Sequence, residues 1–320
     1  MAGADRESLK TSAVLGWVFS GPFPHGVLAV FTVLVCGACA TAPRALPAAP
    51  EGEFAALDAG GRAYFFCDVP LARPVLDLAS IKGMSGNEGG RVLDMTQSAA
   101  AAFYPAGEPR RFLIAAQGAY PKGRINLSLT LSREWKRVVS PAGGKYWRSE
   151  AKGLSLGVDA AGALLADGDP YPRRGAVAVP REYAAIRRGA ALAGWMLDAA
   201  APVNGYLEAM QIPIQIPADR VFFALYPAGE GTGASGGPAA YEAVLRLETP
   251  SASHVQALAA MISLLRTFGA GMGAVDERVS LLKDILLAHP PEQDGSSLIL
   301  RTSPLEPERI ALLFNTFSVY

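Results

Sequence analysis

The chain of 320 residues is half hydrophobic and 18% charged, which is enough apolar material for a buried core and too much for a disordered chain. Lys and Arg together number 29, and so do Asp and Glu, so the formal net charge is zero. A surface built to bind phosphate backbones would carry an excess of basic residues, and we therefore expect no nucleic-acid partner.

Cysteine is too scarce for a framework of bridges. Two of the three cysteines, Cys36 and Cys39, fall in the N-terminal segment and leave Cys67 alone in the rest of the chain. One thiol makes neither an intramolecular disulfide nor a cysteine-rich zinc site. We predict no metal and no cofactor, and we interpret Cys67, which follows an apolar run, as a small hydrophobic side chain of the core.

The first fifty residues have the layout of an export signal. Arg6 and Lys10 precede residues 11–43, which contain no charged side chain. Within this stretch the apolar run 27–35 is followed by small residues at 36–40, an order typical of secretory signals. The run is short for a transmembrane span. We therefore expect the protein to be exported.

Gly37-Ala38-Cys39, directly after that run, resembles the lipobox of bacterial lipoproteins. Cys36 stands where leucine is usual, and in this the segment is similar to the looser lipoboxes of spirochaetes. The resemblance implies a signal peptide at 1–39 and a Cys39 thiol that takes a diacylglycerol, with palmitate as an acyl group. It also implies a Pro/Ala-rich tether at 40–52 and an exported body anchored at the membrane, on the periplasmic or cell-surface side.

Two other outcomes stay open. Ala38-Cys39-Ala40 also fits the A-x-A rule for signal cleavage, which would release a soluble protein after Ala40. Alternatively, residues 13–35 remain as an uncleaved membrane anchor. All three interpretations agree on export.

The rest of the chain contains an internal repeat. Tyr104-Pro105-Ala106-Gly107-Glu108 recurs as Tyr226-Pro227-Ala228-Gly229-Glu230, and each copy lies between two apolar runs. Upstream of each copy, helical apolar spacing predicts a helix, at 70–81 in the first and at 201–210 in the second. The pattern indicates a tandem duplication.

Two later helices are predicted at matching places in the copies. Ser251 can cap a helix that has an apolar stripe and ends at Gly269. In the first copy, apolar residues alternate from Ile125 to Leu131, which by period favours a strand, whereas the repeat favours a helix that ends at 132–136. We follow the repeat and expect a helix.

The predicted fold class is α+β. Residues 154–158 and 163–166 flank a turn and predict a hairpin, and a strand at 298–301 precedes a C-terminal helix. We expect tandem duplicated α+β units at 53–175 and 176–320, with mostly antiparallel sheets and helices on one face.

The glycine-rich stretch 231–236 matches the G-x-G-x-x-G pattern of dinucleotide-binding folds. Those glycines must follow a strand directly and open a helix, whereas here a turn at 226–230 is expected first. The first copy has no glycines at the equivalent place. An elongated hairpin loop explains the stretch better than a nucleotide site.

The same loop matches the G-x-S-x-G pattern of serine hydrolases at 233–237, with Ser235 as the nucleophile. Asp276 or Asp284 would be the acid and His289 the base. A flexible glycine loop does not pre-organise a nucleophile, so a secreted or envelope serine hydrolase is kept only as the alternative function.

Tyr146, Trp147 and Arg148 form the candidate ligand-binding group, because aromatic and arginine side chains are enriched in binding sites. Packing on a half-buried strand is the simpler explanation for the same residues. Asp167-Gly168-Asp169 lacks the spaced oxygen ligands of a calcium loop, and we interpret it as a turn.

These observations predict a membrane-anchored envelope lipoprotein that binds or scaffolds without catalysis. No catalytic residue is assigned. The expected partners are the membrane, through the lipid at Cys39, and an envelope protein or small ligand that the sequence does not identify. A cleft between two similar units would be a natural place for that ligand.

Overall fold

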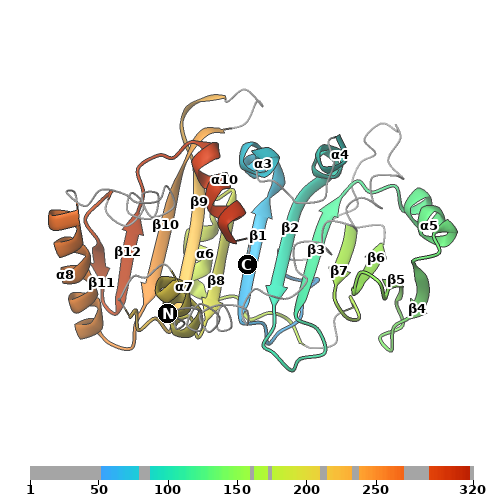
Figure 1. Cartoon of the computed structure of the whole chain (residues 1–320), viewed down its shortest axis with the longest axis horizontal. Helices are drawn as coiled ribbons and strands as arrows, with labels where there is room; N and C mark the ends of the chain where they lie inside the picture. The colour runs from blue at the N-terminus through green and yellow to red at the C-terminus, as the bar shows by residue number, and fades with distance from the viewer. Residues whose placement is uncertain are drawn as a thin grey trace, which may run out of the picture.

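The computed structural model describes residues 52–78, 87–158, 162–171, 175–209, 215–232, 238–269 and 288–317. They form one sheet of twelve strands with helices packed against it (Figure 1). Every pair of neighbouring strands runs antiparallel. The predicted combination of helices with antiparallel strands is therefore confirmed, although the strands belong to a single continuous sheet.

The first half of the chain supplies seven of these strands. In order, its elements are β1 (Ala63–Asp68), α3 (Val69–Leu78), α4 (Asn87–Met95), β2 (Thr96–Phe103), β3 (Phe112–Gly118), α5 (Lys122–Leu131), β4 (Lys136–Val139), β5 (Lys145–Ser149), β6 (Leu154–Val158) and β7 (Gly162–Ala166).

The second half supplies the other five strands. Its elements are α6 (Arg181–Arg187), β8 (Leu192–Leu197), α7 (Ala200–Ala209), β9 (Arg220–Thr232), β10 (Pro238–Glu248), α8 (Ala252–Gly269), β11 (Glu292–Asp294), β12 (Ser297–Arg301) and α10 (Pro307–Phe317). Across the sheet the strands are ordered β11-β12-β10-β9-β8-β1-β2-β3-β7-β6-β5-β4. The two halves therefore meet at the centre, where β1 pairs with β8.

Most of the predicted elements are present. Helices α3 and α7 lie where apolar spacing placed them, and α8 ends at Gly269 as expected. Helix α5 settles the ambiguous stretch, because Ile125 and Leu129, four residues apart, are its two buried side chains. That i, i+4 spacing puts both on one helical face against the sheet, which the alternating pattern concealed.

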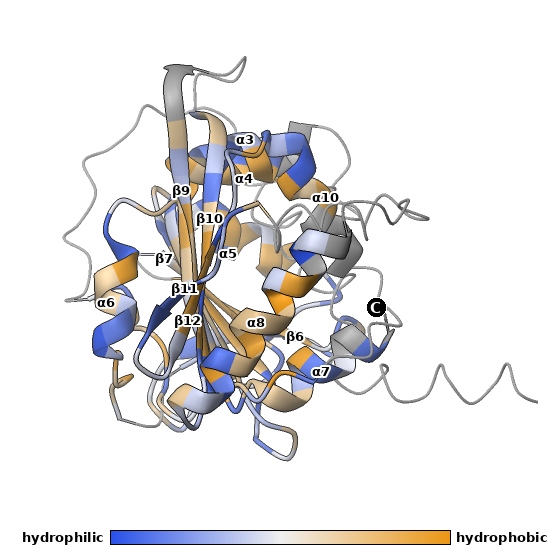
Figure 2. Ribbon diagram, turned by 90° about the vertical axis from the view of Figure 1, so that its left-hand side faces the viewer, coloured by the Kyte–Doolittle hydropathy of each residue, from blue (hydrophilic) through white to orange (hydrophobic). Residues whose placement is uncertain are grey.

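The helices cover both faces of the sheet, which departs from the expectation of one face (Figure 2). Successive residues of a strand point to opposite faces. Trp195 of β8 packs against Tyr183 of α6, with ring centroids 4.6 Å apart, whereas the adjacent Met196 joins the apolar cluster of α8. Helix α6 therefore lies opposite α7, α8 and α10.

The repeated Tyr-Pro-Ala-Gly-Glu segment adopts two different structures. In the first copy Gly107 has a φ of 91°, a left-handed conformation that suits glycine, and the chain turns there. In the second copy residues 226–230 remain in β9, which stays paired with β10 as far as Thr232 and Pro238. The turn expected at 226–230 is therefore wrong, since continued pairing keeps this segment extended and the hairpin long.

No helix among the described residues is long and apolar enough to cross a membrane.

Candidate functional site

Two pockets lie on the face of the sheet that carries α6. The turn at 52–58, where the chain enters the described structure, forms part of the wall of both. One pocket is polar and lies over the first half of the sheet. The other is mainly apolar and lies beside α6.

The polar pocket, of about 460 Å³, has two walls and a floor. Tyr104 and Arg110, from the loop between β2 and β3, form one wall, and Tyr146 and Arg148 of β5 form the other. Residues 167–169, just after β7, lie between them. Two of the three side chains in the candidate ligand-binding group thus line one pocket.

Trp147 points away from this pocket. Its indole Nε1 donates a hydrogen bond to Asn126 Oδ1 of α5 at 3.0 Å, and its ring packs in the core beside Ile125 and Leu129. Alternation along β5 explains the separation, because residues i and i+2 share a face while i+1 takes the other. Tyr146 and Arg148 therefore line the pocket together, and Trp147 packs on the opposite face of the sheet.

Charged groups fix the shape of the polar pocket. Arg110 is buried and forms an ion pair with buried Asp58, and its guanidinium also donates to the Asp169 carbonyl at 2.7 Å. Arg148 donates to the Asp167 carbonyl at 2.6 Å and to Ser155 Oγ at 3.2 Å. Both arginines thus hold the floor segment by its backbone, which pre-organises the walls relative to one another.

The carboxylate of Asp169 is part of the same network. It accepts hydrogen bonds from the Ser140 hydroxyl at 2.5 Å and from the Tyr171 N–H at 3.0 Å. Counting the whole lining, five carboxylates face two guanidinium groups, which disfavours an anionic ligand.

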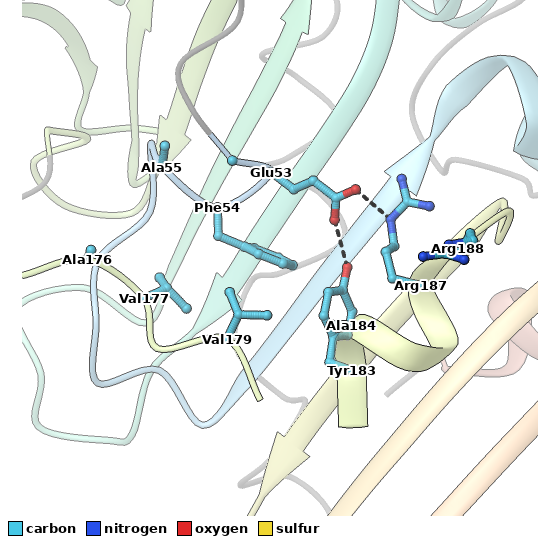
Figure 3. Close-up of a pocket in the computed structure, with 11 residues that line it drawn as sticks. Glu53, Phe54, Ala55, Ala176, Val177, Val179, Tyr183, Ala184, Arg187 and Arg188 are labelled. Atoms are coloured by element: carbon cyan, nitrogen blue, oxygen red, sulfur yellow. Dashed lines mark hydrogen bonds and ion pairs between the residues drawn. The ribbon is translucent and has the colours of Figure 1, made fainter. Parts of the chain in front are cut away.

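The apolar pocket, of about 550 Å³, is closed on one side by a carboxylate (Figure 3). One carboxylate oxygen of Glu53 lies 2.7 Å from Arg187 Nε. The other accepts a hydrogen bond from the Tyr183 hydroxyl at 3.0 Å. Arg187 also stacks over Phe66, 3.9 Å from the ring centroid. Burial and the nearby Glu53 carboxylate raise the pKa of Tyr183, so its hydroxyl remains a donor. Val177 and Val179 complete the apolar wall.

Cys67 lies on the opposite face of the sheet, among the apolar side chains beside α3 and α10. Burial, together with the neighbouring Asp68 carboxylate, raises the pKa of its thiol to about 12. A thiol is a nucleophile or metal ligand only as the thiolate, which this surrounding suppresses. Within the described residues no group of three or more His, Cys, Asp or Glu side chains could hold a metal ion.

The residues of the alternative hydrolase lie mostly outside the described structure. This holds for Ser235, Asp276 and Asp284, as it does for Cys39 of the leader. His289 is described and exposed, with its Nε2 3.5 Å from Ser303 Oγ, next to Thr302, which pairs with Ala243. Pro238, the residue of β10 nearest to Ser235 in the sequence, lies about 16 Å from Ala243 along the strand. The Ser235 hypothesis stays a prediction.

Sequence reasoning missed Asp58 and Arg110. They are 52 positions apart, and neither lies in a recognisable motif. The one local signal was weak: Arg110 and Arg111 follow the repeated Tyr-Pro-Ala-Gly-Glu segment, where the second copy has glycines.

The comparisons with known proteins point to one fold. No protein-family model matches the sequence, and no curated protein sequence matches it either. Crystal form III of TP0453 superposes with a TM-score of 0.55 at 13% identity, covering 83% of this chain and 99% of that one. This chain shares its fold with TP0453.

Two further crystal forms of TP0453 give the same result. Form IV has a TM-score of 0.56 at 14% identity over 82% of this chain and 96% of that one. Form I has a TM-score of 0.53 at 15% identity over 84% and 98%. At identities this low the likeness is one of fold, and function has to be argued from the site.

Proposed function

We propose that this protein is an envelope lipoprotein, anchored through a lipid on Cys39, whose exported body binds a small polar ligand without catalysis. The lipobox-like segment 37–39 supports the anchor. The polar pocket between Tyr104 and Tyr146 is the single observation that carries the binding role. It combines aromatic rings, carboxylates and guanidinium groups in a pre-organised arrangement.

The chemistry of the pocket favours a neutral ligand rich in hydroxyl groups, such as a sugar. A hydroxyl group can both donate to a carboxylate and accept from a guanidinium, so it suits a lining that contains both kinds of group. A tyrosine ring offers an apolar face to the C–H groups of such a ligand, with its hydroxyl at the polar end. An anionic ligand would be repelled by the excess of carboxylates.

The binding role is tested with glucose, galactose and N-acetylglucosamine as probes, by saturation-transfer NMR. Tyr146→Ala should weaken binding at least tenfold, because it removes the ring from one wall. Tyr146→Phe should retain most of the affinity. Leu131→Ala is the matched control, since Leu131 is exposed on α5 and does not line the pocket. Equal binding by wild type and Tyr146→Ala, or no binding of any probe, would contradict the proposal.

The anchor is tested separately, by mass spectrometry of the mature N-terminus in wild type and Cys39→Ser. We expect a diacylated Cys39 that disappears in the variant. An unmodified N-terminus at Thr41 would show release of a soluble protein, and an intact Met1 would show an uncleaved anchor. Either result would reject lipidation while leaving the binding role open.

We also propose that the body arose by tandem duplication. Both halves share an order of elements that supports this: a strand, a helical segment (α3 and α4 in the first half, α7 in the second), two strands, a helix, and two final strands that return to the sheet. In the sheet, this order of strands runs from the centre to the edge in each half, beginning at β1 in the first half and at β8 in the second. Among the residues that the structure describes, the hairpin β4–β5, which carries Tyr146, has no counterpart in the second half. A superposition of the halves that failed to align β1, β2 and β3 with β8, β9 and β10 would contradict the duplication.

A further inference from the structure

Within the described part of the chain the sheet is open, and its two edge strands carry opposite charges. Lys136 and Arg137 are exposed on β4, at one end of the strand order, and Glu292 and Asp294 are exposed on β11, at the other. An edge strand presents backbone N–H and C=O groups that can pair with another strand. Figure 1 shows β4 and β11 at opposite ends of the sheet, next to α5 and α8, and Figure 2 looks onto the β11 edge.

We propose that this protein assembles head to tail, with β4 of one copy pairing with β11 of the next. Direction favours this arrangement. Twelve strands with antiparallel neighbours place β4 and β11 in opposite directions, so a second copy in the same orientation continues the antiparallel alternation. The two faces of the sheet also continue from copy to copy, with α7, α8 and α10 of every copy on the same side.

Charge selects the same arrangement. Pairing β4 with β4 would bring together two strands that each carry Lys136 and Arg137, and antiparallel pairing of β11 with β11 about Gln293 would place Glu292 opposite Asp294 of the other copy. Like charges directly opposite one another destabilise a sheet, whereas opposite charges stabilise it. Glu292 and Asp294 form ion pairs with Arg301 and Arg246 at 3.3 and 3.2 Å within their own chain. Their side chains nonetheless remain 58% and 65% exposed, which leaves room for a second cation.

The surroundings of β4 extend this basic edge. From residue 119 to residue 152 the sequence has eight basic side chains and two acidic ones, in a chain whose total charge is zero. The basic ones are Lys122, Arg124, Arg133, Lys136, Arg137, Lys145, Arg148 and Lys152. Such a concentration of one sign at one end steers an oppositely charged surface toward it.

Exposed leucines flank both edges. Leu127 and Leu131 of α5, beside β4, are 59% and 76% exposed, and Leu264 of α8, beside β11, is 56% exposed. Both helices pack on the same face of the sheet. Head-to-tail pairing would bring α5 of one copy next to α8 of the following copy and cover these side chains. A contact of this kind is heterologous, so repetition gives a ring or an open filament.

Disulfide cross-linking of the full chain in membranes tests the proposal. Val139→Cys on β4 combined with Gln293→Cys on β11 should give a ladder of linked species on non-reducing gels. Mixing the two single variants should give dimers only. Val139→Cys alone should give no dimer, and a Val139→Cys dimer as strong as that of the mixture would overturn the proposal in favour of β4–β4 pairing.

Charge reversal provides the second arm, in the same double-cysteine background. Lys136→Glu with Arg137→Glu should reduce the linked fraction at least tenfold, as should Glu292→Lys with Asp294→Lys. A mixture of the two reversed proteins should recover cross-linking, because each basic edge again meets an acidic one, and recovery also proves that both variants fold. Absence of a ladder in the parent, a ladder insensitive to reversal, or adducts only to a protein of another mass would overturn the proposal.

Discussion

The carboxylate of Glu53 lies 2.7 Å from Arg187 Nε, and this contact joins the beginning of the described structure to α6 in the second half of the chain. Asp58, five residues later, forms its ion pair with Arg110 in the first half. The segment that follows the predicted tether is thus held by charged contacts to both halves of the sheet. Through Glu53 and Asp58 the tether would be joined to the walls of both pockets.

Glu53→Gln should lower the free energy of unfolding by about 1–3 kcal/mol, because it leaves the mostly buried Arg187 guanidinium without its counter-charge. Urea unfolding followed by tryptophan fluorescence measures this. Glu182→Gln is the control, since Glu182 lies 3.7 Å from partly exposed Arg220 and should change stability by less than about 0.5 kcal/mol. Equal effects of the two substitutions would show that the Glu53 contact is not special.

Leu129→Ala should destabilise the protein by about 2–5 kcal/mol, because Leu129 is fully buried between α5 and the sheet and its loss leaves a cavity. Leu131→Ala, on the same helix, removes the same atoms from a side chain that is 76% exposed, and should stay within about 0.5 kcal/mol of wild type. Chemical denaturation of both variants compares them. A small effect of Leu129→Ala would mean that α5 is not packed on the sheet in solution.

Gly194→Ala should destabilise the centre of the sheet by about 1–3 kcal/mol. An added Cβ would lie 2.5 Å from the Tyr64 carbonyl oxygen and 2.7 Å from Phe223 Cε1, so the β1–β8 pair would have to shift. Gly205→Ala in α7 meets no atom within 4 Å and should instead stabilise the helix by about 0.5–1 kcal/mol. Thermal unfolding of the two variants should give shifts of opposite sign, and shifts of the same sign would contradict the prediction.

Ionisation of Tyr120 should lower the free energy of unfolding at alkaline pH. Burial raises the pKa of its hydroxyl to about 12, while a hydrogen bond with Thr96 Oγ1 at 2.7 Å partly opposes the shift. The unfolded chain therefore loses this proton first. The contribution of Tyr120 to stability is complete below pH 10 and is lost as the pH rises from about 10 to about 12.

At pH 8, Tyr120→Phe should be less stable than wild type by about 1 kcal/mol, because the hydrogen bond is gone. At pH 11.5 the order should reverse and the variant should be more stable by about 1 kcal/mol, because ionisation of Tyr120 in the unfolded chain costs the wild type about 2 kcal/mol and phenylalanine does not ionise. Urea unfolding at both pH values is the measurement. Tyr241, whose pKa is also raised to about 12 by burial, should keep some alkaline sensitivity in the variant. If the stability difference between the variant and the wild type did not change with pH, Tyr120 would ionise as readily in the folded protein as in the unfolded chain.

The sequence by itself determined the local elements and which strand positions share a face. Alternation along a strand puts Tyr146 and Arg148 on one face, although the candidate group taken from the sequence also included Trp147, which the structure places on the other face. The stripe of α8 with Gly269 is enough to locate that helix and its end. Such patterns depend on neighbours a few residues apart. These patterns did not decide between a strand and a helix from Ile125 to Leu131, where the alternation favoured a strand and the internal repeat favoured a helix.

Only the tertiary structure decided that β1 pairs with β8, which merges both halves into one sheet and gives it one basic and one acidic edge. It also brought Asp58, Arg110 and Tyr146 into one pocket, and it kept the second Tyr-Pro-Ala-Gly-Glu segment in a strand. These outcomes depend on hydrogen bonds and ion pairs between residues far apart in the chain. Contacts of that kind leave no periodic trace in the sequence, because their free energy comes from the pairing itself and not from the conformational preference of either partner.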